Sequence, residues 1–428
     1  MSRLPLSLAH SFRALRHRNF RLFLGGQVIS LVGTWMQQVA LGWLVYRLTG
    51  SAFLLGVVGF ASQAPSLLVA PFAGVWADRA NLHRMVIAAQ ALAMVQALLL
   101  AALVLAGVVT VPQIVALSLF SGAVSAVDVP ARQSFLVKLV PSRDDLANAI
   151  ALNSSAFNAA RLVGPSVAGV LIALLGEGPV FLLNGLSYVA VIGALVALRL
   201  PPSAPRSASP APVLRTLAEG LRHVYGFLPM RAILLLVALV SVAGVPFQVL
   251  MPVFATDVLR GDSHTLGFLA SAVGTGSLAG ALYMAARPSV RGLGRVITSA
   301  VALTGAALLA FAFSRALWLS MLLLLAAGFG IMLQMAASNT ILQTIVDDDK
   351  RGRVMSLYST SFLGALPLGS LAAGALANRI GAPLTVALGG IACLLGAFAF
   401  ARVLPALRQD VRPVYERLGI PPAAPPDV

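Results

Sequence analysis

Long apolar runs alternate with short charged segments along almost the whole chain. A helix needs about 20 apolar residues to cross roughly 30 Å of hydrocarbon, and twelve runs are long enough. They cover residues 21–46, 53–77, 85–106, 112–136, 147–174, 179–199, 231–256, 265–286, 295–313, 317–343, 352–377 and 382–403. The pattern therefore predicts an all-α membrane protein with twelve transmembrane helices.

The segments outside these runs divide the chain into parts. A break rich in proline, alanine and serine (201–212) is followed by residues 213–228, whose leucines recur at helical spacing and predict an interfacial helix on the membrane surface. The first apolar run is too long for the core of a cleaved signal peptide, so we expect the N-terminal tail to be retained. The expected parts are an N-terminal tail (1–20), a first six-helix bundle (21–199), a linker (200–230), a second six-helix bundle (231–403) and a loose C-terminal tail (404–428) rich in proline and arginine.

The positions of the basic residues predict the orientation. If the N-terminus is inside the cell, nearly all of the 30 lysine and arginine residues fall on inside segments, as the positive-inside rule requires. Four of the six outside loops then hold one basic residue each, namely Arg47, Arg260, Arg315 and Arg379, and the other two hold none. An even number of spans returns the chain to the same side, so both termini are predicted to be cytoplasmic.

Composition excludes several classes of protein. The chain is 59% hydrophobic and 10% charged, whereas soluble domains carry about 25% charged residues. A net charge of +16 would suggest a nucleic-acid partner in a soluble protein. Here apolar spans separate the basic residues, so we expect no nucleic-acid partner. The lipid bilayer of the cell (plasma or inner) membrane is the expected surrounding.

The sequence lacks the motifs that catalysis or metal binding would require, which argues against an enzyme. The sequence has no Gly-Lys-Ser/Thr phosphate loop, which excludes an ATP-driven pump on this chain. The single cysteine, Cys393, lies in an apolar run and is interpreted as a small buried hydrophobe. We expect no cofactor and no metal site, because the five histidines are scattered without ligand spacing: His10, His17, His83, His223 and His264.

Two short motifs of the first half recur in the second half. Leu55-Gly56 matches Leu266-Gly267, and residues 135–145 are echoed by 341–351, at an offset of 206–211 residues. Two six-helix halves that both start inside are parallel repeats, which are typical of secondary transporters that rock about a midplane site. The repeat therefore predicts a transporter, and the alternative is two stacked bundles without a transport role.

Residues 74–84 form a charged interruption between the second and third runs. Gly74 lets another helix approach, Asp78 stands at the cytoplasmic helix end, and Arg79 and Arg84 suit pairing with nearby carboxylates or phosphates. Such a cluster would hold the two halves closed on the cytoplasmic side. The alternative is a solvated positive-inside loop. The matching loop of the second half, 287–295, has arginines but no acid, so a gate would be asymmetric.

Three charged residues lie within or at the end of spans four and five. Asp128 and Arg132 are four residues apart, with Pro130 between them, and Arg161 lies near the middle of the fifth span. A charge at that depth costs at least about 2.5–3.5 kcal/mol and is not expected to face lipid. Two interpretations remain open. Asp128 and Arg161 form a structural ion pair, or the three residues form a proton- and substrate-responsive relay in which Asp128 is the first candidate for proton coupling.

Other mid-span residues predict a cavity. Gly164 and Gly169 allow close helix packing, and Pro165 between them supplies a bend. Amides in hydrocarbon need a partner, so each faces protein or water. The candidates for substrate contact, with helix–helix packing as the alternative for each, are Trp35, Gln38, Gln63, Asn158, Gln248, Gln334 and Asn339. A cavity of this composition suits a bulky amphipathic molecule.

Six stretches together resemble the major facilitator superfamily, and more narrowly its branch of transmembrane secretion effector exporters. They are residues 33–43, 48–51, Asp78-Arg79, 128–133, 146–149 and Gly164-Pro165. The resemblance implies twelve helices, alternating access and export driven by an ion gradient, usually of protons. The segment around Gly164 and Pro165 also resembles the antiporter signature of such exporters. Gly74, Asp78 and Arg79 match the superfamily loop, but residues 81–83 lack its further charges.

The sequence thus predicts a secondary transporter that exports a small amphipathic molecule, siderophore-like or drug-like, by proton antiport with alternating access. Its expected partners are this substrate, protons and the bilayer, and the protein is expected to be monomeric. Two alternatives are kept: a proton-coupled importer of a small molecule, and a non-transporting membrane partner or sensor.

Overall fold

The computed structural model describes residues 12–79, 81–140, 142–199, 226–287, 289–347 and 350–417, with the backbone alone at 68, 70–79, 143 and 144. The chain divides into two compact units. The first comprises Met1–Ser209 and Arg260–Ser271, and the second comprises Pro210–Leu259 and Ala272–Val428. The predicted interfacial helix at 213–228 lies almost wholly outside the described residues.

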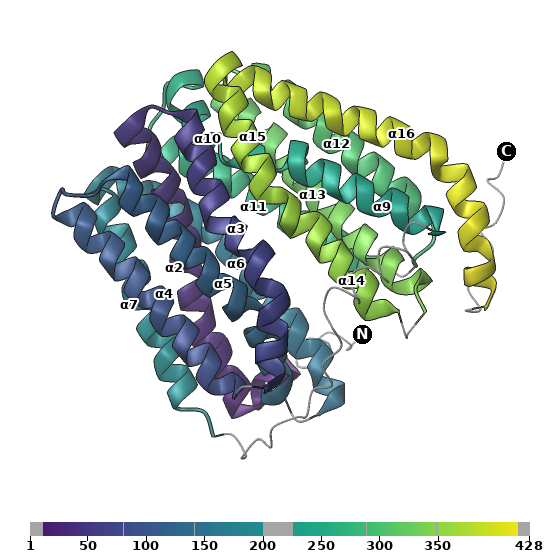
Figure 1. Cartoon of the computed structure of the whole chain (residues 1–428), viewed down its shortest axis with the longest axis horizontal. Coiled ribbons are helices and arrows are strands. Elements are labelled where there is room, and N and C mark those ends of the chain that lie inside the picture. The colour runs from purple at the N-terminus through teal and green to yellow at the C-terminus, as the bar shows by residue number, and fades with distance from the viewer. Residues whose placement is uncertain are drawn as a thin grey trace, which may run out of the picture. The chain divides into compact units, whose positions relative to one another are not determined.

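The first unit is a bundle of long helices preceded by a short 3-10 helix, η1 (Arg13–Arg16). Within it, α2 packs against α6 and α7, α4 packs against α5 and α7, and α3 packs against α5 (Figure 1). The N-terminal part of α11 (Ser263–Ala286) also belongs to this unit. The helices are α2 (Arg18–Thr49), α3 (Ala52–Arg79), α4 (Leu82–Leu105), α5 (Val111–Leu139), α6 (Arg143–Leu175) and α7 (Glu177–Val196).

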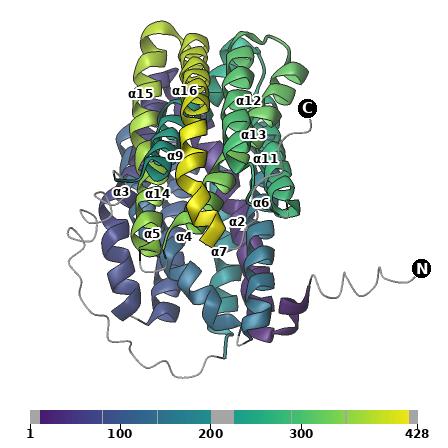
Figure 2. The same ribbon diagram turned by 90° about the vertical axis from the view of Figure 1, so that its right-hand side faces the viewer.

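The second unit contains the rest of α11 and the C-terminal helices, with α12 packed against both α13 and α16 (Figure 2). Its helices are α9 (Leu228–Leu239), α10 (Met251–Val253), α12 (Leu293–Phe313), α13 (Leu317–Ile345), α14 (Arg351–Ser359), α15 (Ala365–Ile380) and α16 (Ala382–Arg417). Two of the predicted spans are irregular. The span at 231–256 is interrupted by π-helical η2 (Val240–Gly244), 3-10 helical η3 (Pro246–Gln248) and π-helical η4 (Phe254–Val258), and the span at 352–377 by π-helical η5 (Thr360–Gly364).

Within the described residues, eleven helices are long and apolar enough to cross a membrane. The apolar run described in α3, Ala52–Leu67, is shorter, because only the backbone is described over most of its remainder. Large apolar side chains face outward on many helices, and Leu174 and Trp318 are 71% and 70% exposed. An apolar surface of this extent is expected of a protein surrounded by lipid. The all-helical membrane fold predicted from the apolar runs is confirmed.

The prediction of a loose segment beginning at Leu404 is wrong for residues up to Arg417, which continue α16. Leu407 and Val411 recur at helical spacing and are buried in the core of the second unit. This burial stabilises the helix in spite of Pro405 and Pro413. Within the predicted N-terminal tail, Ala14 of η1 is buried in the core of the first unit.

Candidate functional site

A buried carboxylate lies inside the first unit. Asp128, near the middle of α5, is 7% exposed. Its Oδ1 accepts a 2.8 Å hydrogen bond from Nε2 of Gln90 on α4, and its Oδ2 lies 3.2 Å from a guanidinium nitrogen of Arg132, one turn further along α5. A carboxylate removed from water needs such partners. Asp128 and Arg132 thus form an ion pair within α5, and Gln90 is a partner that the sequence did not indicate.

Arg161, near the middle of α6, occupies a different environment. Its guanidinium carbon lies 5.4 Å from the ring centroid of Trp35 on α2, which is a cation–π arrangement. Trp35 in turn meets Phe157 edge to face, with ring centroids 5.7 Å apart and an interplanar angle of 71°. Gly164 makes the contact between α2 and α6 possible, because a Cβ there would lie 2.6 Å from the Trp35 Cβ. Trp35, Phe157 and Arg161 therefore form one cluster, here called the Arg161 cluster.

The structure thus brings together two of the three residues of the predicted relay and places Arg161 apart from them. No ion pair joins Asp128 to Arg161 in the described part of the chain. The helix lengths explain this separation. Arg161 lies 18 residues after Arg143, and Asp128 lies 11 residues before Leu139. The difference of seven residues amounts to roughly 10 Å along antiparallel helices at about 1.5 Å per residue.

A chain of side-chain amides connects three helices of the same unit. Asn184 on α7 donates to Oε1 of Gln37 on α2 (2.8 Å), and Gln37 donates to Oε1 of Gln96 on α4 (3.0 Å). The predicted cavity residue Gln38 is exposed, and its neighbour Gln37 makes these contacts. Sequence reasoning missed this chain of hydrogen bonds. The adjacent pair Gln37-Gln38 inside an apolar run was the available signal, but it did not indicate which amide faces the bundle.

Of the remaining cavity candidates, the two in the first unit make hydrogen bonds within their own helices. Gln63 donates to the carbonyl of Gly59 and Asn158 to that of Ser154, each within its own helix. In the second unit, three candidates lie on two elements. Gln248 is the last residue of η3 and is half-buried. Asn339 accepts a hydrogen bond from Gln343, which is also on α13. Gln334 is buried, and its Nε2 has no hydrogen-bond partner in the described structure.

The segment of α6 in which the sequence predicts a bend packs closely against α11 within the first unit. Pro165 lies inside α6. A Cβ on Gly169 would lie 3.1 Å from the Cα of Gly267, and the Ser263 hydroxyl donates to the Gly169 carbonyl (3.1 Å). The small residues therefore permit the close helix contact that the sequence predicted.

The predicted gate is only partly described. The side chains of Asp78 and Arg79 and the surroundings of Gly74 lie outside what the structure describes, and α3 ends at Arg79. Arg84 is exposed in the first turn of α4.

Residues 81–83, where the expected charges are missing, have structural roles. The Asn81 side chain caps α4 by accepting from the backbone N–H groups of His83 and Arg84, and Leu82 is buried. His83 donates from Nε2 to the Leu195 carbonyl (2.8 Å) and stacks on Phe135. These positions hold a cap and core contacts in place of charge.

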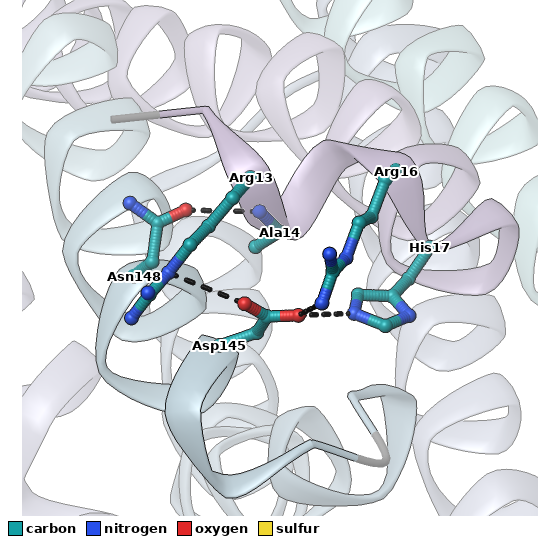
Figure 3. Close-up of polar contacts among 6 residues, drawn as sticks. All are labelled: Arg13, Ala14, Arg16, His17, Asp145 and Asn148. Carbon is teal, nitrogen blue, oxygen red and sulfur yellow. Dashed lines mark hydrogen bonds and ion pairs between the residues drawn. The ribbon is translucent and has the colours of Figure 1, made fainter. Parts of the chain in front are cut away.

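A cluster of charged groups joins η1 to the start of α6 (Figure 3). The Asp145 carboxylate is in contact with Arg13 Nε (3.2 Å), an Arg16 guanidinium nitrogen (2.6 Å) and His17 Nε2 (2.8 Å). Nearby, Asn148 Oδ1 accepts from the backbone N–H of Ala14 (3.0 Å). The Asp145 side chain is only 2% exposed. Sequence reasoning missed this cluster, because in the sequence Arg13 and Arg16 show only the positive charge expected of an inside segment.

The helices of spanning length and the charged residues within them are features of a membrane transporter, and comparison with known proteins identifies the family. A model of the transmembrane secretion effector family matches residues 9–418. The chain belongs to this family of the major facilitator superfamily. As a transmembrane secretion effector it is a multi-pass membrane protein that transports small molecules, and it is not an enzyme.

Three relatives in sequence are similar over most of their length. The chain is 26% identical to the staphyloferrin A transporter of Staphylococcus aureus, over 89% of this chain and 95% of that protein. It is 30% identical to the multidrug efflux pump Tap of Mycolicibacterium fortuitum, over 87% and 92%. It is 22% identical to macrolide efflux protein A of Streptococcus pyogenes, over 83% and 88%.

Solved structures of other transporters share the fold of this transmembrane secretion effector. The nucleoside transporter NupG superposes with a TM-score of 0.70 at 12% identity, covering 91% of this chain and 99% of that one. A bacterial homologue of the lysosomal transporter Spinster gives 0.70 at 14% identity, covering 92% and 98%. At such low identity the likeness concerns the fold alone.

Proposed function

We propose that this protein exports a small amphipathic molecule, siderophore-like or drug-like, by proton antiport with alternating access. The observation that carries the proton coupling is the buried Asp128 with its two partners, Gln90 and Arg132. An ionisable residue inside a membrane span marks a functional site by default. Export is favoured by the relatives in sequence, of which two are efflux proteins.

Asp128 has the contacts of a residue that responds to protonation. When ionised, its carboxylate accepts from Gln90 and attracts the Arg132 guanidinium. A proton on Asp128 removes the negative charge and with it the attraction for Arg132. The freed guanidinium then changes the contacts between successive turns of α5. This local change is the coupling step that we assign to the proton, which enters from outside as substrate leaves.

The remaining sequence predictions complete the proposal. The two six-helix halves (21–199 and 231–403) alternate about a midplane site, both termini and the linker (200–230) are cytoplasmic, and the protein acts as a monomer. Gly74, Asp78, Arg79 and Arg84 form the cytoplasmic gate. Residues 81–83 provide a helix cap and core contacts and carry none of the further charges of the superfamily loop. The gate therefore holds the cytoplasmic side closed less strongly than the usual superfamily loop does.

Direction and coupling are tested together in membrane vesicles. Everted vesicles energised to an acidic interior should accumulate ethidium or fluorescein, two amphipathic dyes of opposite charge, and nigericin should abolish the accumulation by collapsing the pH gradient. An importer would accumulate dye in right-side-out vesicles instead. A membrane partner or sensor without transport activity would accumulate neither dye in either preparation, and either of these results would contradict the proposal.

A further inference from the structure

The positive charge of Arg161 has no negative partner in the described part of the first unit. Its guanidinium makes no hydrogen bond or ion pair there and lies against the face of Trp35. The carboxylates described in this unit are all engaged elsewhere. Asp128 pairs with Arg132, Asp145 with η1, Glu177 with Arg47, and Asp262 caps the start of α11. No described acid is therefore left to neutralise Arg161.

A single aromatic contact does not offset the cost of placing a charge at this depth in a membrane helix. A charge near the middle of a membrane helix costs at least about 2.5–3.5 kcal/mol on insertion scales. A cation–π contact returns roughly 0.5–2 kcal/mol. The difference is met by water or by an anion, and a guanidinium binds a carboxylate through two parallel hydrogen bonds. The arrangement is thus suited to an anionic ligand.

The Arg161 cluster also offers an apolar surface beside the charge. Phe157 lies one turn before Arg161 on α6, is 43% exposed, and contacts the Trp35 ring edge to face. Trp35 and Arg161 are themselves half-buried, so part of each remains accessible. The close contact at Gly164 involves backbone atoms of α2 as well as Trp35, which fixes the position of the ring. A rigid aromatic surface next to an unpaired cation is complementary to a molecule that carries both an acidic and an aromatic or apolar group.

We propose that Arg161, Trp35 and Phe157 bind the acidic group and the adjoining apolar body of the transported molecule, so that the substrate class is an amphipathic organic anion. This inference rests on the proposed transport function and narrows it. Arg161 holds the anion, the face of Trp35 keeps the guanidinium in place, and Phe157 supplies apolar contact.

Binding to the purified full-length protein tests the inference without requiring transport. Isothermal titration calorimetry in detergent would compare 2-naphthoate with 2-naphthamide, which has the same aromatic body but no charge. Wild-type protein should bind the acid about tenfold more tightly than the amide, the difference expected of charge-assisted hydrogen bonds. Arg161→Gln should bind both equally. Arg402→Gln is the matched control, because Arg402 stacks on Phe398 at the surface of α16 (4.6 Å), and it should bind as wild type does.

A folding defect is separated from a binding defect by Arg161→Lys. This variant keeps the positive charge but loses the planar fork, so its preference for the acid should fall several-fold while its elution in size-exclusion chromatography stays normal. Equal affinities for acid and amide in the wild type, or a full preference in Arg161→Lys or Arg161→Gln, would overturn the inference. The two proposals can fail separately. If everted vesicles accumulate ethidium but the purified protein does not prefer 2-naphthoate to 2-naphthamide, the substrate class is refuted and the export proposal stands.

Discussion

The side-chain amide of Gln90 donates a 2.8 Å hydrogen bond to the buried carboxylate of Asp128, and so links α4 to α5 in the interior of the first unit. With Arg132 at 3.2 Å on the same helix as Asp128, one donor comes from each of the two helices. Such partners are needed in a membrane interior, where a buried carboxylate without them is strongly disfavoured. A change in the charge of Asp128 therefore affects two helices at once.

Asp128→Asn should uncouple transport from protons. The amide is close in size but cannot titrate, so the initial rate of transport driven by a pH gradient in proteoliposomes should fall by about tenfold or more, as for loss of a positioned proton-transfer group. Exchange of labelled for unlabelled substrate without a gradient should persist, because it needs no net proton movement. Asp410→Asn, at an exposed position on α16, is the control and should behave as wild type. A normal gradient-driven rate in Asp128→Asn would refute coupling through this carboxylate.

Asp78→Asn should weaken the proposed cytoplasmic gate. Cys393, the single cysteine, is buried, so background labelling should be low. A reporter cysteine replacing Ser154, an exposed residue in the first half of α6, should react faster with an impermeant maleimide added to the cytoplasmic side when Asp78 is neutralised. Asp410→Asn in the same reporter background should leave the rate unchanged. Equal labelling rates with and without Asp78→Asn would favour a solvated loop over a gate.

The apolar runs predicted the all-helical membrane fold, because the thickness of the hydrocarbon layer constrains the length of a spanning helix strongly. Partner choice within the bundle was less predictable. Asp128 and Arg161 are the two charges deepest in spans four and five, yet they are separated by helix rise and engage Gln90 and Trp35 instead. The partner of a side chain depends on the rotation of its helix about the helix axis. Membrane helices carry apolar residues on every side, so the sequence pattern does not reveal this rotation.

The continuation of α16 was missed for a related reason. Two prolines after Leu404 suggested an irregular tail, although Leu407 and Val411 already showed helical spacing. Burial of both side chains in the core of the second unit decides the outcome, and such burial is not visible in local sequence.

Gly164→Ala should destabilise the contact between α2 and α6. The added Cβ would lie 2.6 Å from the Trp35 Cβ, 3.1 Å from the Val32 carbonyl oxygen and 3.3 Å from the Met36 backbone nitrogen. Backbone atoms cannot rotate away, so we expect a loss of about 1–3 kcal/mol in the free energy of unfolding, as for other overpacked sites, and a lower melting temperature in detergent.

Gly193→Ala is the matched control for Gly164→Ala. Gly193 lies within α7, and a Cβ there would meet no atom within 4 Å. Alanine is favoured over glycine in a helix by about 0.5–1 kcal/mol, so this variant should melt at the same or a slightly higher temperature. Equal melting temperatures for the two variants would show that α2 and α6 do not approach as closely at Gly164 as described.

Asp145→Asn should release η1 from the start of α6. The substitution removes the negative charge that Arg13, Arg16 and His17 share at 2.6–3.2 Å. Ala14 is fully buried beneath this cluster, so loosening η1 should also expose part of the core. We expect a lower melting temperature, faster tryptic cleavage after Arg13 and Arg16, and faster amide hydrogen exchange in residues 13–17.

The comparison for Asp145→Asn is an ion pair on the surface. Glu416 meets Arg412 at 2.8 Å on α16, but their side chains are 53% and 71% exposed, and exposed pairs contribute only about 0–1 kcal/mol. Glu416→Gln should therefore change neither melting temperature nor cleavage near the N-terminus. If Asp145→Asn is equally silent, the contacts of Asp145 do not hold η1, and the burial of Ala14 with the Asn148 hydrogen bond to its backbone N–H is sufficient to order this segment.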